Sequence, residues 1–144
     1  MRIKHIDHIN FTVKNLAESV EWYSRIFGFE SQEAGIYQDK YPWQILRAGE
    51  ALLCMYEYPE RSHPLPTGPE AERFHSLGHY AFRITDREAW EAMIAREAIP
   101  LREGDPIDYP HSTAWYVYDP TGYEIEVSLW HGDAVQFSHA EAMG

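Results

Sequence analysis

Residues 116–127 read YVYDPTGYEIEV, which predicts two short β-strands joined by a tight turn. Pro120 presets the backbone for a turn, and Gly122 tolerates a positive φ. Because side chains alternate between the faces of a strand, Glu124 and Glu126 share one face of the outgoing strand. A carboxylate such as that of Glu126, in the middle of an apolar strand, is costly to bury without a cation. The stretch therefore predicts a β-hairpin that presents an anionic group to a cation.

The same order of elements occurs twice along the chain. Residues 78–85, GHYAFRIT, resemble residues 7–14, DHINFTVK, and each segment is followed by a helical pattern and then by further strands. A proline-rich linker separates the two copies. The repeat predicts an α+β fold of two βαβββ modules that form a cupped, curved mixed sheet. The expected limits within a single domain over 1–144 are about 3–58 for module one, 59–77 for the linker, about 78–130 for module two and 131–144 for a polar tail.

Turn and cap residues set the expected limits of the individual elements. Asn15 is expected to cap the first helix, with Leu16, Val20, Tyr23 and Phe27 on its core face, and Gly28 is expected to end it. One helical turn is expected in the linker near 71–74. The remaining expected elements are strands at 5–13, 29–34, 43–48, 51–58, 78–85, 99–101, 114–118 and 123–129, and a second helix at 86–97.

Composition limits the classes of partner. The 144 residues carry 12 Lys and Arg against 23 Asp and Glu, a net charge of −11, which argues against nucleic acid or an anionic membrane as the main partner. Cys54 is the only cysteine, so no internal disulfide can form, and a cytoplasmic location is expected. The N-terminal residues contain no long apolar run, so neither a signal peptide nor a membrane span is expected.

The repeat also predicts a site. His8 corresponds to His79 at an offset of 71, and Cys54 corresponds to Glu126 at an offset of 72. Two modules related by a pseudo-twofold axis would bring such equivalent positions together. Imidazole and carboxylate are metal ligands, so His8, His79 and Glu126 are predicted to hold a divalent metal, with positions left open for substrate. Cys54 is expected to be a core residue or a pocket wall, with coordination as the alternative.

Alternation alone allows either Glu124 or Glu126 to be the carboxylate ligand. The repeat selects Glu126, because Glu124 corresponds to the apolar Leu52. Glu124 lies nearer the turn, where water is expected to solvate it. Replacing Glu126 by Gln is therefore expected to weaken metal binding greatly, and replacing Glu124 by Gln to change it little.

These motifs resemble the vicinal oxygen chelate superfamily, which includes glyoxalase I, fosfomycin-resistance and bleomycin-resistance proteins and extradiol dioxygenases. The resemblance covers roughly residues 3–130 and rests on DHINFTV, GHYAF and YDPTGYEIEV. It implies paired βαβββ modules, a homodimer, and His8, His79 and Glu126 as the metal ligands. It also implies a Glu at the position of Cys54 in glyoxalase I, from which this chain departs. The basic loop of fosfomycin-resistance proteins is replaced here by DPIDYPHST at 105–113.

The extradiol dioxygenases match in finer detail, because Tyr116, Asp119-Pro120, Gly122 and Glu126 keep the spacing of their signature. Ring cleavage of a catechol by Fe(II) and O₂ is therefore the leading expectation, with Mn, Zn or Ni as other possible metals. A glyoxalase-like lyase or isomerase is one alternative, and a metal-free binding protein of the bleomycin-resistance type is the other. The substrate is expected to be a small aromatic or vicinal-oxygen compound. The expected catalytic residues are Tyr116 and His111, and the expected substrate-binding residues are Asn10, Cys54, Tyr56 and Trp43.

Overall fold

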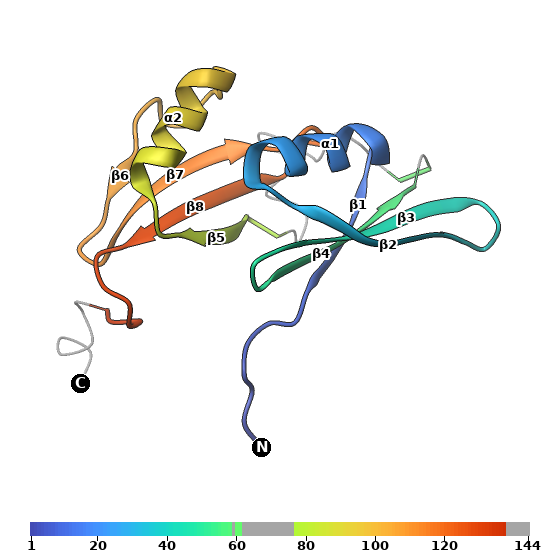
Figure 1. Cartoon of the computed structure of the whole chain (residues 1–144), viewed down its shortest axis with the longest axis horizontal. Helices are drawn as coiled ribbons and strands as arrows, with labels where there is room; N and C mark the ends of the chain where they lie inside the picture. The colour runs from blue at the N-terminus through green and yellow to red at the C-terminus, as the bar shows by residue number, and fades with distance from the viewer. Residues whose placement is uncertain (59, 62–76, 138–144) are drawn as a thin grey trace. The chain divides into compact units, whose positions relative to one another are not determined.

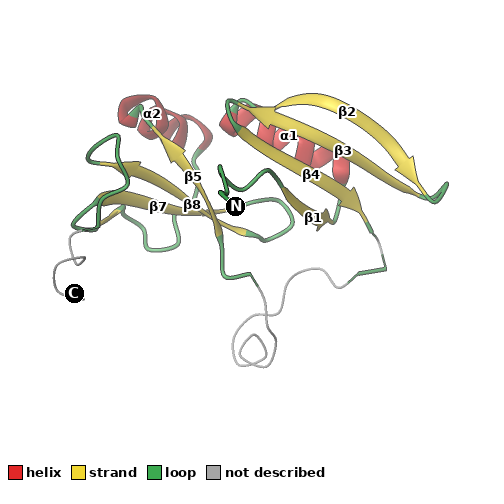
Figure 2. Cartoon of the chain, turned by 90° about the horizontal axis from the view of Figure 1, so that it is seen from below, coloured by secondary structure: helices red, strands yellow, loops and turns green. Residues whose placement is uncertain are grey.

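The computed structural model of the chain describes residues 1–58, 60–61 and 77–137, which divide into two compact units. One unit comprises Met1–Phe74 with Asp119–Gly122, and the other comprises His75–Tyr118 with Tyr123–Gly144. Each unit has a four-stranded sheet and a helix against one of its faces (Figures 1 and 2). The helical turn expected near 71–74, and nearly all of the linker expected over 59–77, lie outside the described residues.

The first unit contains one βαβββ module. Its sheet has the order β1-β4-β3-β2, in which β1 runs parallel to β4 and the other neighbours are antiparallel. The strand expected at 5–13 begins only at residue 9. The elements are β1 (Ile9–Val13), α1 (Leu16–Phe27), β2 (Glu30–Tyr37), β3 (Tyr41–Ala48) and β4 (Ala51–Glu57).

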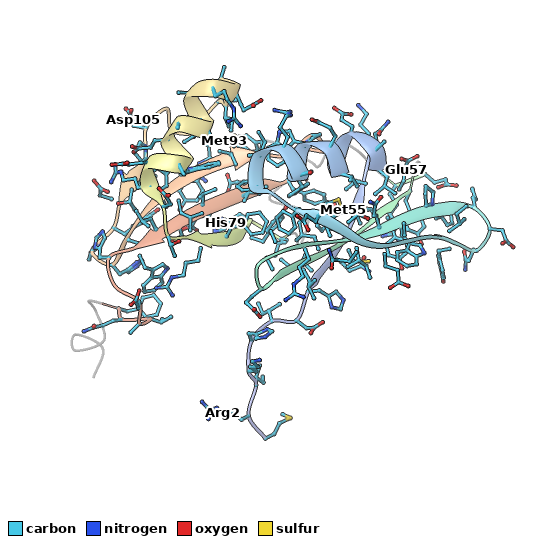
Figure 3. The ribbon with its side chains drawn as sticks, viewed as in Figure 1. Arg2, Met55, Glu57, His79, Met93 and Asp105 are labelled. Atoms are coloured by element: carbon cyan, nitrogen blue, oxygen red, sulfur yellow. The ribbon has the colours of Figure 1, made fainter. Side chains whose placement is uncertain are left out.

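Helix α1 begins and ends where the cap residues predict. The side chain of Asn15 accepts a hydrogen bond of 2.9 Å from the backbone N–H of Glu18, and Gly28 closes the helix at a φ of 71°. Glu57, labelled in Figure 3, lies at the end of β4, and its carboxylate accepts a hydrogen bond of 2.7 Å from the backbone N–H of Leu16. The buried face of α1 consists of Leu16, Ser19, Tyr23 and Ile26.

The turn at 119–122 belongs to the first unit, although it connects two strands of the second sheet. The buried Asp119 accepts hydrogen bonds from the backbone N–H groups of Thr121 and Gly122 at 3.0 and 2.8 Å. The buried hydroxyl of Tyr23 donates to the same carboxylate at 2.8 Å, and the N–H of Lys14 donates to the Thr121 hydroxyl at 3.1 Å. The first two hydrogen bonds close the turn, and the last two tie it to the first module.

The second unit repeats the topology with the order β5-β8-β7-β6, again with one parallel pair, β5 with β8. The strand expected at 99–101 is absent there, and β6 takes its place in the sheet order. Pro100 explains the difference, because a proline cannot donate to a strand ladder. The elements are β5 (Tyr80–Ile84), α2 (Arg87–Glu97), β6 (Ile107–Asp108), β7 (Ser112–Tyr118) and β8 (Glu124–Trp130).

Strand register confirms the internal repeat and the α+β class. Asn10 pairs with Cys54 across β1 and β4, and Ala81 pairs with Glu126 across β5 and β8. The second pair follows the first by 71 and 72 residues, which are the offsets that relate the two copies of the repeat in the sequence. Cys54 and Glu126 occupy equivalent places in their sheets. Within the described part of the chain, both helices fall short of the length and apolar character that crossing a membrane requires.

Candidate functional site

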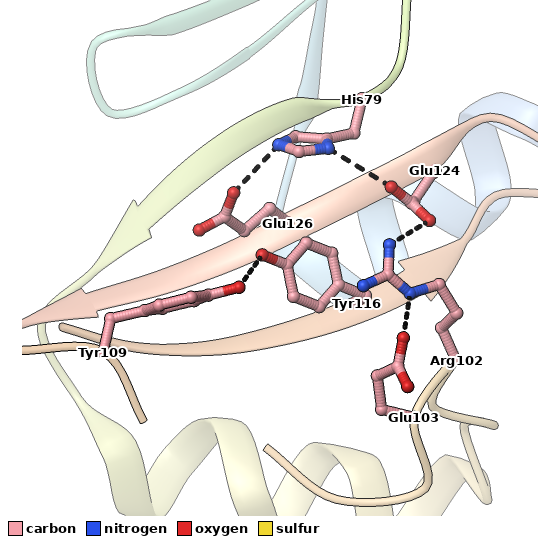
Figure 4. Close-up of polar contacts among 7 residues, drawn as sticks. All are labelled: His79, Arg102, Glu103, Tyr109, Tyr116, Glu124 and Glu126. Atoms are coloured by element: carbon pink, nitrogen blue, oxygen red, sulfur yellow. Dashed lines mark hydrogen bonds and ion pairs between the residues drawn. The ribbon is translucent and has the colours of Figure 1, made fainter. Parts of the chain in front are cut away.

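The second sheet brings three of the predicted site residues together on the face opposite α2. His79 directly precedes β5, Glu126 lies on β8, and Tyr116 is the cross-strand partner of Glu126 on β7. The Nε2 atom of His79 lies 2.9 Å from Oε2 of Glu126 (Figure 4). The rings of His79 and Tyr116 meet edge to face with centroids 5.6 Å apart. His79 remains 38% exposed, so this cluster is open to solvent.

Glu124 joins the same cluster, and the expectation that water solvates it is wrong. Its side chain is only 15% exposed and has a partner on each oxygen. Oε2 lies 3.2 Å from Nδ1 of His79, and Oε1 lies 2.9 Å from a guanidinium nitrogen of Arg102. Continuing the parallel register of β5 and β8 by one residue sets His79 opposite Glu124. Two carboxylates, two residues apart on one strand face, therefore flank one imidazole.

The His79 and Glu126 atoms fit a divalent cation. Two ligands that are neighbours in an octahedral shell, each about 2.1 Å from the metal, lie about 3.0 Å apart. The observed 2.9 Å therefore suits either a shared proton or a shared metal ion. Negative charge exceeds positive charge here, since the cluster holds the carboxylates of Glu124 and Glu126 and only the guanidinium of Arg102, which pairs with Glu124. A nitrogen and an oxygen donor in an anionic setting suit Fe, Mn, Zn or Ni.

Arg102 and Tyr109 complete the surroundings of Tyr116. The guanidinium of Arg102 lies over the Tyr116 ring at 4.0 Å from its centroid, and the backbone N–H of Arg102 donates to the Tyr116 carbonyl at 2.9 Å. The hydroxyls of Tyr109 and Tyr116 are 2.9 Å apart. Burial, then the hydrogen bond with Tyr109 and the charge of Glu126, raise the pKa of Tyr116. Tyr116 therefore keeps its proton at neutral pH and can donate a hydrogen bond.

His111 lies in an aromatic stack rather than beside Tyr116. Its ring stacks on Trp130 at 4.9 Å and on Tyr109 at 5.9 Å between centroids, and its Nδ1 lies 2.8 Å from the Ser112 hydroxyl. His111 and Trp130 also line a cleft of about 330 Å³. The Tyr109 ring connects this stack to Tyr116, so His111 touches the cluster only through Tyr109.

The remaining predicted residues share one face of the first sheet, opposite α1. Asn10 pairs with Cys54, and Tyr56 pairs with Trp43. Burial raises the pKa of the Cys54 thiol, as suits a pocket wall more than a ready ligand. His8 lies just before β1 and its Nδ1 is 2.7 Å from the Asp7 carboxylate.

Aromatic rings dominate this first-sheet face. The ring centroids of Trp43 and Tyr56 lie 6.2 Å apart with the rings tilted by 31°, and Tyr58 continues the row at 6.1 Å from Tyr56 with the same tilt. Gly35 lets the Trp43 indole lie flat on β2, since a Cβ there would come within 2.7 Å of the ring. The face therefore offers flat apolar surfaces to a planar molecule.

Neither unit, over its described residues, gathers three or more His, Cys, Asp or Glu side chains into a group that could hold a metal ion. The structure thus brings together His79, Glu126 and Tyr116 in one unit, and Asn10, Cys54, Tyr56 and Trp43 in the other. Sequence reasoning missed Arg102, Tyr109 and the ion pairs of Glu124. A lone arginine after a proline and a tyrosine in a loop carry no sequence signal for these contacts.

Comparison with known proteins identifies relatives over most of the chain. The family model described as Glyoxalase/Bleomycin resistance protein/Dioxygenase superfamily matches residues 5–127. The metallothiol transferase FosB of Staphylococcus haemolyticus is 28% identical over 127 residues, covering 87% of this chain and 83% of that protein. FosB of Staphylococcus epidermidis matches with the same identity and coverage.

Solved structures share the fold. A glyoxylase/bleomycin resistance protein/dioxygenase domain from Frankia sp. EAN1pec gives a TM-score of 0.74 at 17% identity, covering 90% of this chain and all of that one (100%). A glyoxalase family protein from Enterococcus faecalis gives a TM-score of 0.71 at 23% identity, covering 89% and 99% of the two chains. At these identities the similarity concerns the fold alone.

Proposed function

Because the chain belongs to the Glyoxalase/Bleomycin resistance protein/Dioxygenase superfamily, we propose that it is an enzyme that uses one divalent metal ion to bind two neighbouring oxygens of a small substrate. The observation that carries this proposal is the 2.9 Å contact between His79 Nε2 and Glu126 Oε2 on an open sheet face. His8 is taken as the third protein ligand because it is equivalent to His79 in the repeat. A metal held by these residues supplies a Lewis acid that eases loss of a proton from a bound hydroxyl.

The chain's own side chains have separate roles in this proposal. Tyr116 holds a proton at its hydroxyl and donates it in a hydrogen bond to a substrate oxygen. The Tyr109 hydroxyl, 2.9 Å away, keeps that group oriented. Trp43 and Tyr56 provide flat surfaces against which a planar substrate stacks, and Asn10, with Cys54 beside it, shapes the pocket wall.

Ring cleavage is the leading reaction within this class. A catechol and O₂, with Fe(II) bound, would give a ring-opened product that contains both oxygen atoms and needs no external reductant. The aromatic row of the first sheet supports a planar substrate. We also place the protein in the cytoplasm, because a single cysteine suits a reducing compartment.

Thiol transfer is the second candidate, and one observation favours it. The curated relatives that match over 87% of the chain are named metallothiol transferases. In that reaction a thiol adds to a small oxygen-bearing substrate. The three metal ligands proposed above would serve thiol transfer as well as ring cleavage. The two reactions differ in the metal ion and in the second substrate. A glyoxalase-like reaction would need the same metal site.

Metal analysis tests the class of function before any substrate is chosen. The wild type, purified without chelator and reconstituted anaerobically, should hold about one divalent metal per chain. Variants His8→Ala, His79→Ala and Glu126→Gln should lose most of it, whereas Asp108→Asn, on β6, should keep it. A wild type that resists loading with Fe(II), Mn(II), Zn(II) and Ni(II) would contradict the proposal and favour a metal-free binding protein.

Activity assays then separate the reactions. Oxygen uptake with Fe(II) and a panel of catechols tests ring cleavage. Consumption of a low-molecular-weight thiol with Mn(II) and fosfomycin tests thiol transfer, and the hemithioacetal of methylglyoxal tests the glyoxalase alternative. Ring cleavage is supported only if oxygen uptake disappears in Tyr116→Phe or falls at least 10-fold while metal content is retained. Turnover of fosfomycin without oxygen uptake would replace it with thiol transfer.

A further inference from the structure

We propose that Arg83 binds a carboxylate at the far end of the substrate, which makes the substrate a planar vicinal-oxygen compound with an anionic side chain. The inference deepens the proposed function and rests on it, because the two neighbouring oxygens are taken to bind a metal at His79 and Glu126 (Figure 4). Arg83 would then determine specificity without touching the metal.

The strand register places Arg83 on the same face of the second sheet as His79 and Glu126. Side chains two residues apart share a face, so Glu126, Ser128 and Trp130 on β8 point to one side. Arg83 on β5 lies opposite Ser128, and its guanidinium lies over the Trp130 ring at 4.7 Å from the centroid. The guanidinium therefore lies between the rows of Ser128 and Trp130, about 7 to 13 Å along the strand from Glu126.

A small exposed residue separates the two ends of this face along β5. Ala81 lies between His79 and Arg83 on the same face, pairs with Glu126 and is exposed. Its methyl group leaves the strand open to a ligand that extends from Glu126 toward Arg83. Ala114, in the corresponding part of β7, is fully buried. The open path therefore follows β5.

The charge of Arg83 has no carboxylate partner among the described residues, unlike that of its neighbours. The other arginines in the described part of the second unit each lie 2.7 to 3.2 Å from a glutamate oxygen: Arg87, Arg96 and Arg102. One terminal nitrogen of Arg83 donates to the carbonyls of Gly132 and Asp133, at 2.9 and 3.3 Å. These contacts hold the guanidinium in place and leave its other N–H groups for a ligand. A carboxylate is the acceptor that suits them, because both partners are charged.

The first test compares two catechols that differ by one charge, 3-(3,4-dihydroxyphenyl)propanoate and its methyl ester. Anaerobic calorimetry measures their affinity for the Mn(II)-loaded full-length protein, so no reaction has to occur. Arg83→Gln removes the cation. Arg87→Gln is the matched control, because Arg87 lies over Trp115 at 5.5 Å from the ring centroid, on the face that carries α2.

The second test needs no metal. The ¹H–¹⁵N signal of the Arg83 Nε–H group reports a carboxylate bound beside it, and its loss in Arg83→Gln assigns it. Metal-free protein is titrated with 3-phenylpropanoate at about pH 6, where a carboxylate is ionised. The signal should shift with 3-phenylpropanoate and should not shift with 3-phenyl-1-propanol, which lacks the charge.

We expect the wild type and Arg87→Gln to bind the acid about fivefold more tightly than the ester, a modest preference because Arg83 is exposed and water screens its charge. In Arg83→Gln the preference should vanish or reverse, since a net charge of −11 repels an anion.

The inference is overturned if the wild type binds acid and ester equally, if Arg83→Gln keeps the wild-type preference, or if 3-phenylpropanoate leaves the Arg83 signal unmoved. Arg83 would then serve only to fix the segment after β8. A loaded wild type that binds neither catechol refutes the proposed function, and the metal-free titration then decides for or against the carboxylate site by itself.

Discussion

Removing the Tyr23 hydroxyl should destabilise the fold measurably, because that group donates to a buried carboxylate. The hydroxyl lies 2.8 Å from Asp119 Oδ2, and Tyr23 is fully buried while Asp119 is 5% exposed. A hydrogen bond to a charged group contributes about 1.5–3 kcal/mol, and water cannot replace the donor at this depth. Tyr23→Phe should therefore lower the free energy of unfolding by about 2 kcal/mol and the Tm by about 4–8 °C.

Urea unfolding followed by far-UV circular dichroism measures this change, provided that the m-value stays constant. Tyr118→Phe is the matched control, since its side chain is 46% exposed and its loss should cost less than about 0.5 kcal/mol. A double-mutant cycle with Asp119→Asn isolates the contact, with an expected coupling of about 1–2 kcal/mol. A Tyr23→Phe variant as stable as Tyr118→Phe, or a coupling near zero, would refute this account of the turn.

Three further predictions concern the helix cap, the buried phenol and the assembly. Asn15→Ala should lower the free energy of unfolding by about 1 kcal/mol in the same urea assay, because the Glu18 N–H loses its acceptor; no change would show that the cap is replaceable. The folded state raises the pKa of Tyr116, so the stability linked to its protonated form is complete below its ordinary value of about 10 and is lost as pH rises beyond it. Above about pH 10, wild-type stability should therefore fall more steeply than that of Tyr116→Phe, measured by urea midpoints at successive pH values; parallel curves would contradict this. Equilibrium sedimentation should give a homodimer at micromolar concentration, and a monomer there would contradict the expectation of a dimer.

The features that sequence predicted correctly are periodic or local. Asn15 and Gly28 bound α1 because capping depends on residues within one turn of the helix end. The equivalence of Cys54 and Glu126 was predictable because a repeat preserves strand register. These inferences needed only alternation, spacing and self-similarity.

The features that sequence missed depend on contacts between distant residues. The closeness of Glu124 to the turn suggested that water solvates it, but Arg102, 22 residues earlier in the chain, pairs with its carboxylate. That segment is irregular because Pro100 prevents the expected strand, and irregular backbone has no periodicity from which to predict side-chain direction. Tyr109 reaches Tyr116 through the short β6–β7 hairpin, which likewise left no pattern. Helix and strand propensities predict neither the contact of Arg102 with Glu124 nor that of Tyr109 with Tyr116.

The inclusion of residues 119–122 in the first unit bears on how the chain can be divided. A fragment that stops at residue 74 would contain all of β1 to β4 and α1, yet Tyr23 would lack the Asp119 carboxylate and Lys14 would lack the Thr121 hydroxyl. The first module alone would therefore have unmet hydrogen bonds. The boundary between the two repeats in the sequence is thus not the boundary between the two compact units, and a fragment meant to fold as the first unit needs residues 119–122 as well.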